Sequence, residues 1–543
     1  MHREMRIRTL PGRSAMIDML ALSKHSLESE SIGLTAPKDD RLRARDSSLD
    51  LDSESLNALA EAFVKIGTQY FSDVTNRRVF PSLTGSDLQI RFDEPPPKEA
   101  TTLQALIEDC QDVIEGSRHN GHPRFFGYVA SPSTPVGAFA DLLASTLNPS
   151  VTSWRSSPSA TQIEQTVVRW LGSLIGYDDN AHGLLTSGGS LANLTALLIA
   201  HRNRSTSPVS ETGIQDSGPQ MTVYASDQVH FSIIKAADIL GLGHQSVRLI
   251  PTDDRFCVDI AALREAIERD RQQGLKPFCV VGSAGTAATG AIDSLIEIGD
   301  LAREHDLWFH VDGAYGAPAA MIGERNPEFA GLELADSVSL DPHKWLYTPV
   351  DCGCLLFRDA STARKAFTAE ADYVKVHELA EIESFAFWDY GIELSRRFRA
   401  LKVWLTLKYY GAQRIAAAIA DDIAMANYMA ESVRECPQLE LLAPVQLSIC
   451  CFRYVPLQLR TQLEASASDV ERKRVEAEIN RVNEQIMYRV QRGGQAYLSN
   501  AMLRGKFALR ACVINFRTTR ADIDLTLQTV RDVAQQVELE NGA

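Results

Sequence analysis

The chain has 543 residues, of which 45% are hydrophobic and 23% charged, a composition typical of a globular enzyme with two or three domains. Its net charge of −15 argues against a general binder of nucleic acids or anionic membranes, and no apolar run reaches the roughly 18 to 20 residues that span a bilayer. The nine cysteines are scattered without a framework spacing, which favours reduced thiols in a cytoplasmic protein and predicts no metal site.

Four segments differ in pattern. Residues 1–50 are polar and lack steady periodicity, so they are expected to form a mobile extension. Residues 51–130 carry apolar helical faces interrupted by Pro95-Pro96-Pro97, which predicts a helical N-terminal segment. Residues 131–395 alternate short apolar strands with helical stretches and predict one large domain. Residues 396–543 begin with a long helix followed by strand-like stretches, the pattern of a smaller α+β domain.

Short apolar runs in the large segment are strand candidates. They are 183–186, 222–225, 278–282, 307–311, 337–340 and 353–357. Because helical stretches separate them, the pattern predicts an α/β fold with a mainly parallel sheet covered by helices on both faces. Ligands bind at the carboxyl ends of the strands in such sheets, so polar residues that directly follow these runs are the candidate site residues.

A glycine turn follows the first of these strands. The residues Gly188, Gly189 and Ser190 lie between the strand and a helix, where exposed backbone N–H groups and the positive end of the helix dipole suit a phosphate. The Ser190 hydroxyl adds a donor. The same residues could equally form only a tight turn.

Two more strand ends carry candidate ligand contacts. His230 follows the second strand, where an imidazole could stack on an aromatic cofactor and exchange a proton; alternatively it caps a helix or packs in the core. Thr286 lies in the small-residue turn at 285–293 after the third strand, which allows close approach of the backbone to a ligand but also fits a plain loop.

An aspartate and a lysine end the next two strands. Asp312 closes the fourth strand, and Lys344 follows the fifth strand in the segment Asp341-Pro342-His343-Lys344-Trp345. Pyridoxal 5'-phosphate (PLP) requires this pair, because a lysine amine forms a Schiff base with its aldehyde and a carboxylate keeps its pyridine nitrogen protonated. Taken alone, Asp312 could be only a helix cap.

Together these motifs resemble the group II PLP-dependent decarboxylases, the family of aromatic L-amino-acid, histidine and glutamate decarboxylases. The resemblance runs from about Leu56 to the C-terminus. Its most specific segment is the one around Lys344. It also includes the motifs at 121–127 (GHPRFFG), 157–161 (SPSAT) and 394–402 (LSRRFRALK).

The resemblance implies a fold and a set of roles. The fold is the aspartate-aminotransferase type, PLP-dependent transferase fold type I, expected as an intertwined homodimer with shared active sites, in which the segment 51–130 takes part. Lys344 would carry the internal aldimine, Asp312 would face the pyridinium nitrogen and His230 would stack on the ring. The remaining contacts implied are Ala314 on the opposite ring face and Gly189, Ser190 and His343 near the phosphate.

The implied activity is decarboxylation of an L-amino acid, with aromatic substrates favoured, to the amine and carbon dioxide through a quinonoid intermediate. The alternatives are an aromatic aldehyde synthase, or a decarboxylase for a polar amino acid such as glutamate or histidine. In the aromatic decarboxylases a loop tyrosine protonates Cα, and aligning backwards from Ser395 places Phe387 there, which would favour the aldehyde synthase. Tyr373 and Tyr390 lie nearby.

Other residues bear on substrate choice. Ser150 and Thr152 align with the lining of the aromatic ring pocket, where a polar lining would admit a polar side chain; alternatively both cap the turn before Trp154. Arg510 resembles the arginine that holds the substrate carboxylate in glutamate decarboxylases, although an ordinary salt bridge is an alternative.

Overall fold

A computed structural model describes residues 49–207, 209–214, 218–367 and 382–541. The predicted extension 1–50 therefore lies almost wholly outside the described residues. The chain divides into two compact units after Glu61. Within the described residues no helix combines the length and apolar character that crossing a bilayer demands.

The large domain is built on a seven-stranded sheet in the order β2-β8-β7-β6-β5-β3-β4. Its strands are β2 (His182–Thr186), β3 (Met221–Ser226), β4 (Val247–Ile250), β5 (Lys276–Ser283), β6 (Trp308–Asp312), β7 (Ser337–Leu340) and β8 (Gly353–Phe357). The strands from β3 to β7 pair in parallel, and β8 is antiparallel to both of its neighbours. The predicted mainly parallel sheet is thus confirmed, and only the edge strand β4 was not anticipated.

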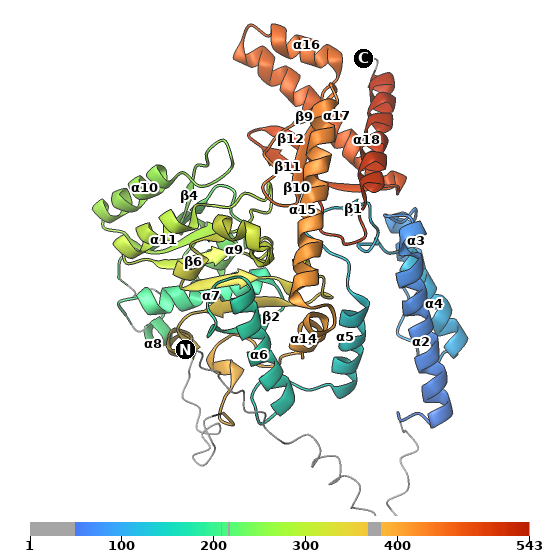
Figure 1. The fold of residues 1–543 in the computed structure, drawn as a ribbon, viewed down its shortest axis with the longest axis vertical. Coiled ribbons are helices and arrows are strands. Elements are labelled where there is room, and N and C mark those ends of the chain that lie inside the picture. Colours follow the sequence, from blue (N-terminus) through green and yellow to red (C-terminus); the bar gives the residue numbers. More distant parts are fainter. Residues whose placement is uncertain (1–48, 208, 215–217, 368–381, 542–543) are drawn as a thin grey trace, which may run out of the picture. The chain divides into compact units, whose positions relative to one another are not determined.

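Helices cover both faces of this sheet (Figure 1). His310 of β6 bonds to Asn193 of α7 (Gly189–Arg204), whereas its neighbour Phe309 lies against Gly299 of α11 (Leu295–Glu304). Successive strand residues point to opposite faces, so α7 and α11 lie on opposite sides. The other helices of this domain are α6 (Pro158–Leu174), α9 (Ser232–Ile239), α10 (Ile260–Gln272), α12 (Pro342–Trp345), α13 (Ala360–Phe367) and α14 (Ala400–Tyr410).

The smaller C-terminal domain contains a five-stranded sheet in the order β1-β11-β12-β10-β9. Its elements are β1 (Phe125–Phe126), β9 (Leu439–Leu441), β10 (Ile449–Tyr454), β11 (Tyr497–Leu503), β12 (Lys506–Cys512), α16 (Leu457–Ala465), α17 (Asp469–Gly493) and α18 (Arg520–Asn541). The segment 51–130, predicted to be helical, also contributes β1, which pairs in parallel with β11 of this sheet.

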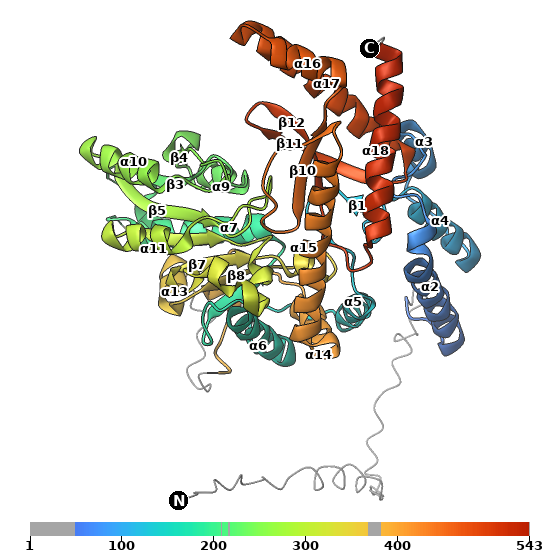
Figure 2. The same cartoon turned by 45° about the horizontal axis from the view of Figure 1, so that its top comes forward.

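The long helix α15 (Ala412–Glu435) runs from the large domain to the C-terminal sheet (Figure 2). Its buried Asp422 accepts hydrogen bonds from Trp345 Nε1 at 2.9 Å and from the Tyr347 hydroxyl at 2.7 Å. Burial raises the pKa of Asp422 to about 7. The helix is thereby anchored to the segment that carries Lys344.

The N-terminal helices differ from the rest in burial. The helices α2 (Ser53–Asp73), α3 (Gly85–Phe92) and α4 (Leu103–Glu115) bury none of their residues. The next helix, α5 (Pro135–Leu147), exposes the side chains of Phe139, Leu142, Leu143 and Leu147. Large exposed apolar surfaces of this kind mark interaction sites.

Candidate active site

A cavity of about 740 Å³ opens where the parallel strands end, and residues of the C-terminal sheet contribute to its wall. Most of the residues selected from the sequence line it. They are Gly189, Ser190, His230, Thr286, Asp312, Ala314, His343, Lys344 and Arg510. Ser150, Thr152 and Phe387 do not line it. The strand-end argument therefore brings together side chains that are up to 321 positions apart in the chain (510 − 189).

The lysine and the aspartate come from the ends of neighbouring strands. Asp312 is the last residue of β6, and Lys344 lies in the short helix α12 that follows β7. The Lys344 amine makes an ion pair of 2.8 Å with Asp341, whose carboxylate is almost fully buried. An amine and a buried carboxylate thus face one cavity from adjacent strands.

Three donors fix the orientation of the Asp312 carboxylate. Asn193 donates its amide to Oδ2 at 2.9 Å. The backbone N–H of Ala314 and the hydroxyl of Ser339 donate to Oδ1 at 3.1 and 3.3 Å. A carboxylate held by several donors keeps one position, as an electrostatic partner for a cation requires.

A buried chain of hydrogen bonds supports Asn193 from behind. Trp308 Nε1 donates to the Ser337 hydroxyl, which donates to His310 Nδ1 at 2.9 Å. His310 Nε2 then donates to Asn193 Oδ1 at 3.0 Å. Burial lowers the pKa of His310, which keeps the ring neutral, so that one nitrogen accepts while the other donates. The direction of these bonds is set by Asn193, whose two amide hydrogens go to Ser232 and Asp312, so that its Oδ1 accepts from His310 Nε2 and the Nδ1 of the neutral ring accepts from Ser337.

His230 belongs to the same network. Asn193 donates its second amide hydrogen to the Ser232 hydroxyl at 3.0 Å, and this hydroxyl lies 2.8 Å from His230 Nδ1. The backbone N–H of Ser232 also donates to Nδ1, so His230 caps the start of α9 as well as lining the cavity. Burial lowers the pKa of His230, against an opposing effect of Asp312. With Nδ1 accepting, the proton of the neutral ring is on Nε2.

The start of α7 is suited to a phosphate. Gly189 and Ser190 begin α7 directly after the turn that follows β2, so free backbone N–H groups lie there. A Cβ at Gly189 would lie 3.0 Å from Ala314 Cβ and from Asp341 Oδ2, so glycine avoids two close contacts. His343 lines the same cavity, and its Nδ1 donates to the Cys352 carbonyl at 2.7 Å.

Thr286 and Arg510 approach the cavity from the side of the C-terminal sheet. The Thr286 hydroxyl is buried against Thr289 at 3.0 Å and accepts from the backbone N–H of Ala291. Arg510 donates to the Ala288 and Tyr128 carbonyls at 3.1 and 2.9 Å. It also donates to the Ser499 hydroxyl, and among the described residues it has no carboxylate partner.

Ser150 and Thr152 lie outside this cavity. Thr152 shares a hydrogen bond of 2.8 Å with the Ser156 hydroxyl, and the Ser150 carbonyl accepts from Ser157. These contacts fit the structural alternative, in which both residues cap the turn before Trp154. Within one subunit the two residues cannot line a substrate pocket around Lys344.

The assignment of Phe387 to the protonating loop position is contradicted. Its side chain is fully buried beneath the Arg396 guanidinium, 4.0 Å from the ring centroid, and packs edge-on against Phe385. A side chain in the core of its own subunit cannot touch substrate. Tyr390 is also committed to packing, between Phe357 and Phe385. Tyr373 lies outside the described residues. The sequence pattern could not reveal that Phe387 is buried, because the position of a loop residue depends on how the loop packs.

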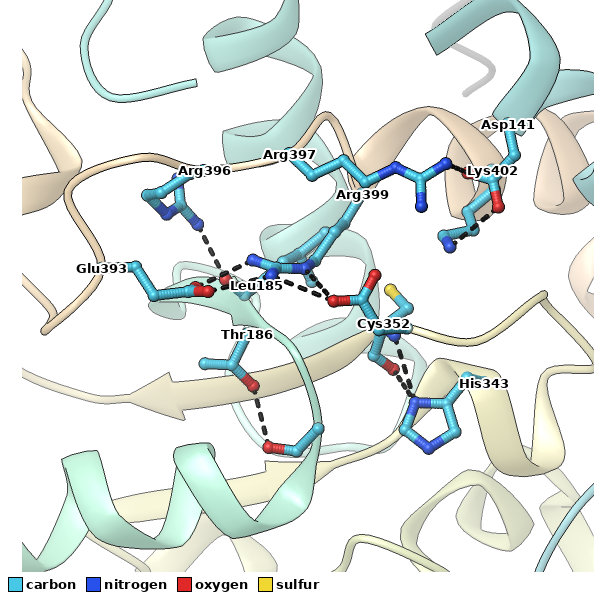
Figure 3. A network of polar contacts seen from close by, with 12 residues as sticks. Asp141, Leu185, Thr186, His343, Cys352, Glu393, Arg396, Arg397, Arg399 and Lys402 are labelled. Carbon is cyan, nitrogen blue, oxygen red and sulfur yellow. Dashed lines mark hydrogen bonds and ion pairs between the residues drawn. The ribbon is translucent and has the colours of Figure 1, made fainter. Parts of the chain in front are cut away.

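The motif at 394–402 holds the cavity's supporting strands together (Figure 3). Arg396 is buried against Glu164 of α6 and donates to the Leu185 carbonyl of β2. Arg399 binds Glu393 with both terminal nitrogens and reaches Asp351, the neighbour of Cys352. The motif thereby joins β2, α6 and the segment that positions His343.

Replacing Arg396 by methionine is expected to lower the free energy of unfolding by about 3–5 kcal/mol, because Glu164 would remain buried without its charge partner. The matched control is Arg397→Met, which removes an exposed guanidinium 3.5 Å from Asp141 and should cost no more than about 1 kcal/mol. Urea unfolding of both variants measures the difference. Equal losses would show that the Arg396 pair contributes no more than a surface contact.

The sequence analysis did not single out Asn193 or Ser232, although their contacts connect Asp312 with His230. A signal was present for Asn193, since it lies four positions after Gly189 and therefore on the same face of α7 as the glycine that borders the cavity. No local signal identifies Ser232.

The cavity fits PLP in its donor chemistry. It offers an amine, a fixed carboxylate and a neutral imidazole, and Gly189 leaves close contacts of 3.0 Å for any added Cβ. Asp341 Oδ1 is buried and lacks a partner among the described residues, so it calls for a hydrogen-bond donor at this place. In the described part of the chain no three metal-ligating side chains gather at one place.

Comparison with known proteins agrees with this chemistry. Residues 86–455 match the model of the pyridoxal-dependent decarboxylase conserved domain. The aromatic-L-amino-acid decarboxylase of Bacillus atrophaeus is 35% identical over 492 residues, which cover 90% of this chain and 98% of the relative.

Solved structures show the same fold. The crystal structure of mouse CSAD superposes with a TM-score of 0.83 at 26% identity and covers 89% of this chain and 99% of its own. That of Rhodiola rosea 4-hydroxyphenylacetaldehyde synthase superposes with a TM-score of 0.78 at 29% identity and covers 90% and 99%. With the family match, these likenesses confirm the predicted fold type I and the PLP cofactor. The chain belongs to the group II PLP-dependent decarboxylases, which are carboxy-lyases acting on amino acids.

Proposed function

We propose that this enzyme removes the α-carboxylate of an L-amino acid with an aromatic side chain and releases the amine. The observation that carries the proposal is the pairing of Lys344 and Asp312 at the ends of adjacent strands in one cavity. The relative from Bacillus atrophaeus is named an aromatic-L-amino-acid decarboxylase, and the cavity wall includes Tyr128, Phe231 and Met502, which suit an apolar ring.

Each residue has a separate task in this proposal. PLP, when bound, supplies an electron sink for the pair of electrons that the breaking Cα–carboxylate bond releases. Lys344 would hold the cofactor covalently, and Asp312 would maintain a positive charge at the ring nitrogen. Gly189, Ser190 and His343 would bind the phosphate. The neutral His230 and Ala314 would contact the ring.

Arg510 is proposed to bind the substrate carboxylate. Its bonds to the Ala288 and Tyr128 carbonyls fix the plane of the guanidinium, so little side-chain freedom is lost when a carboxylate binds. The fixed guanidinium would thereby orient the Cα–carboxylate bond of the substrate for cleavage.

The proposal is tested by incubating purified holoenzyme with each common L-amino acid and measuring carbon dioxide and amine. The highest kcat/KM is expected for phenylalanine, tyrosine or tryptophan. A higher value for glutamate or histidine would contradict the aromatic assignment while leaving the decarboxylase intact.

We also propose a homodimer in which the N-terminal helices form the interface. The apolar side chains that α5 exposes, and helices α2 to α4 without a buried residue, support this arrangement. In such a dimer Ser150 and Thr152 are expected to face the partner's cavity. The cytoplasmic location proposed for this dimer is consistent with its nine free thiols.

The aldehyde synthase remains the second candidate, since Rhodiola rosea 4-hydroxyphenylacetaldehyde synthase is similar over 90% of the chain. With Phe387 buried and Tyr390 packed, Tyr373 is the remaining one of the two tyrosines near the expected loop position. We therefore propose Tyr373 as the proton donor to Cα, which favours simple decarboxylation.

Tyr373→Phe is expected to lower amine formation by about 10²-fold or more, the usual contribution of a positioned acid, and to raise the share of aldehyde, ammonia and peroxide. Phe387→Tyr is the matched control and should leave the product ratio unchanged, because that side chain is buried. Amine and peroxide assays on both variants measure the ratio. If only Phe387→Tyr altered the product ratio, position 387 and not Tyr373 would be the protonating loop position.

A further inference from the structure

A second, smaller pocket of about 280 Å³ lies beside the catalytic cavity and has no role in the chemistry above. It is formed by the end of α2, the segments 118–121 and 131–133, the segment 348–350 and Arg517. Val350 lines both spaces, and Ser131 donates its hydroxyl to the His343 carbonyl at 3.1 Å. The two spaces therefore share a wall.

The pocket is cationic in a protein whose net charge is −15. Arg118 and Arg517 line it, and none of its lining residues is acidic. Among the described residues neither guanidinium has a carboxylate partner. Two unpaired guanidinium groups facing one small space are unfavourable unless an anion compensates them.

The contacts of each arginine also favour a bound anion. Arg118 Nε donates to Asn120 Oδ1 at 3.1 Å, and its guanidinium lies over the rings of Phe125 and Tyr128. These contacts fix its position without neutralising its charge. Arg517 is half-buried, and burial lowers the pKa of its guanidinium. A bound anion would offset this desolvation cost.

An independent observation comes from Thr348. This residue is 2% exposed and lines the pocket, and its hydroxyl has no hydrogen-bond partner among the described residues. A buried hydroxyl without a partner costs about 1–3 kcal/mol, so such groups nearly always have a ligand or a water. Asn120 and Ser133 add further donors at the same place.

We propose that this pocket is a binding site for a small oxyanion, a phosphate or a short carboxylate, held by Arg118, Arg517 and the Thr348 hydroxyl. Planar guanidinium forks bind both kinds of oxyanion, and a neutral hydroxyl donor completes the set. The volume of about 280 Å³ accommodates a small oxyanion. This site is separate from the phosphate-binding end of the catalytic cavity, which Gly189 and His343 border.

The test uses holoenzyme saturated with PLP, so that the cofactor's own phosphate site is filled. Inorganic phosphate and acetate are titrated separately at an ionic strength held constant with chloride salt, and the thermal unfolding midpoint is recorded. A saturable rise of Tm with one of the two oxyanions is expected, and the one that acts at lower concentration identifies the ligand class.

Three variants test whether the rise of Tm comes from binding in this pocket. Arg517→Gln should abolish it, and Thr348→Val, which keeps the shape of the side chain, should weaken the apparent affinity about 10-fold or more. Arg472→Gln, which removes an exposed guanidinium on α17, is the control and should respond like the parent enzyme. If Arg517→Gln does not fold, Thr348→Val still decides the question.

Crystals of the holoenzyme soaked in selenate give a direct readout, with an anomalous peak expected between Arg118 and Arg517. The proposal is overturned if the Tm follows ionic strength alone, if Thr348→Val responds with the affinity of the parent, or if the selenate peak is absent from the pocket.

Discussion

Replacing Lys344 by alanine is expected to lower the turnover of every substrate by at least about 1,000-fold, since positioned reactive groups supply about 10²- to 10⁴-fold each. The amine lies in the catalytic cavity and is held by Asp341 at 2.8 Å, so its loss removes the covalent attachment point without disturbing the core. Initial-rate assays of carbon dioxide release measure the effect.

Lys344→Arg separates charge from nucleophilicity. Arginine keeps the cation opposite Asp341 but stays protonated at all working pH values, so it cannot attack an aldehyde. This variant should be as inactive as Lys344→Ala while retaining more of the parent's thermal stability. Reductive trapping with borohydride followed by peptide mapping should locate PLP on the Lys344 peptide of the parent enzyme. Near-normal turnover of Lys344→Ala, or trapping on another peptide, would refute the assignment.

Asp312→Asn is expected to slow carbon dioxide release by about 10- to 1,000-fold and to weaken PLP retention. A carboxylate beside a cation shifts a pKa by about 1–3 units, which corresponds to about 1.4–4 kcal/mol of stabilisation of the charged ring nitrogen. The asparagine keeps the shape of the side chain, so the loss reports on charge. Steady-state kinetics at saturating PLP, together with cofactor retention on dialysis, measure both effects.

Two further variants test whether the effect of Asp312→Asn is specific to this carboxylate. Asp300→Asn alters an exposed carboxylate of α11 that pairs with Arg303, and it should leave the rate unchanged. Asn193→Ala removes the donor to Asp312 Oδ2 and to Ser232 and should weaken PLP retention less than Asp312→Asn does. If Asp312→Asn retained the parent's rate, the carboxylate would have no electrostatic role toward the cofactor.

The sequence by itself determined the parallel sheet and the residues at its carboxyl edge. Strand periodicity is local, and parallel strands separated by helices present their ends at one edge, so Asp312 and Lys344 had to meet there. The glycine at 189 could be predicted for the same reason, because a helix that starts at a strand end needs backbone N–H groups free for a ligand.

Only the tertiary structure decided which side chains meet across elements. Asn193 of α7 joins Asp312 of β6 to Ser232 of α9, β1 pairs with the C-terminal sheet, and Phe387 lies beneath Arg396. None of these follows from spacing, because contacts between distant segments depend on how helices pack on the sheet, and loop register has no periodicity to fix it. The same holds for the pocket at Arg118 and Arg517, whose residues are 399 positions apart (517 − 118).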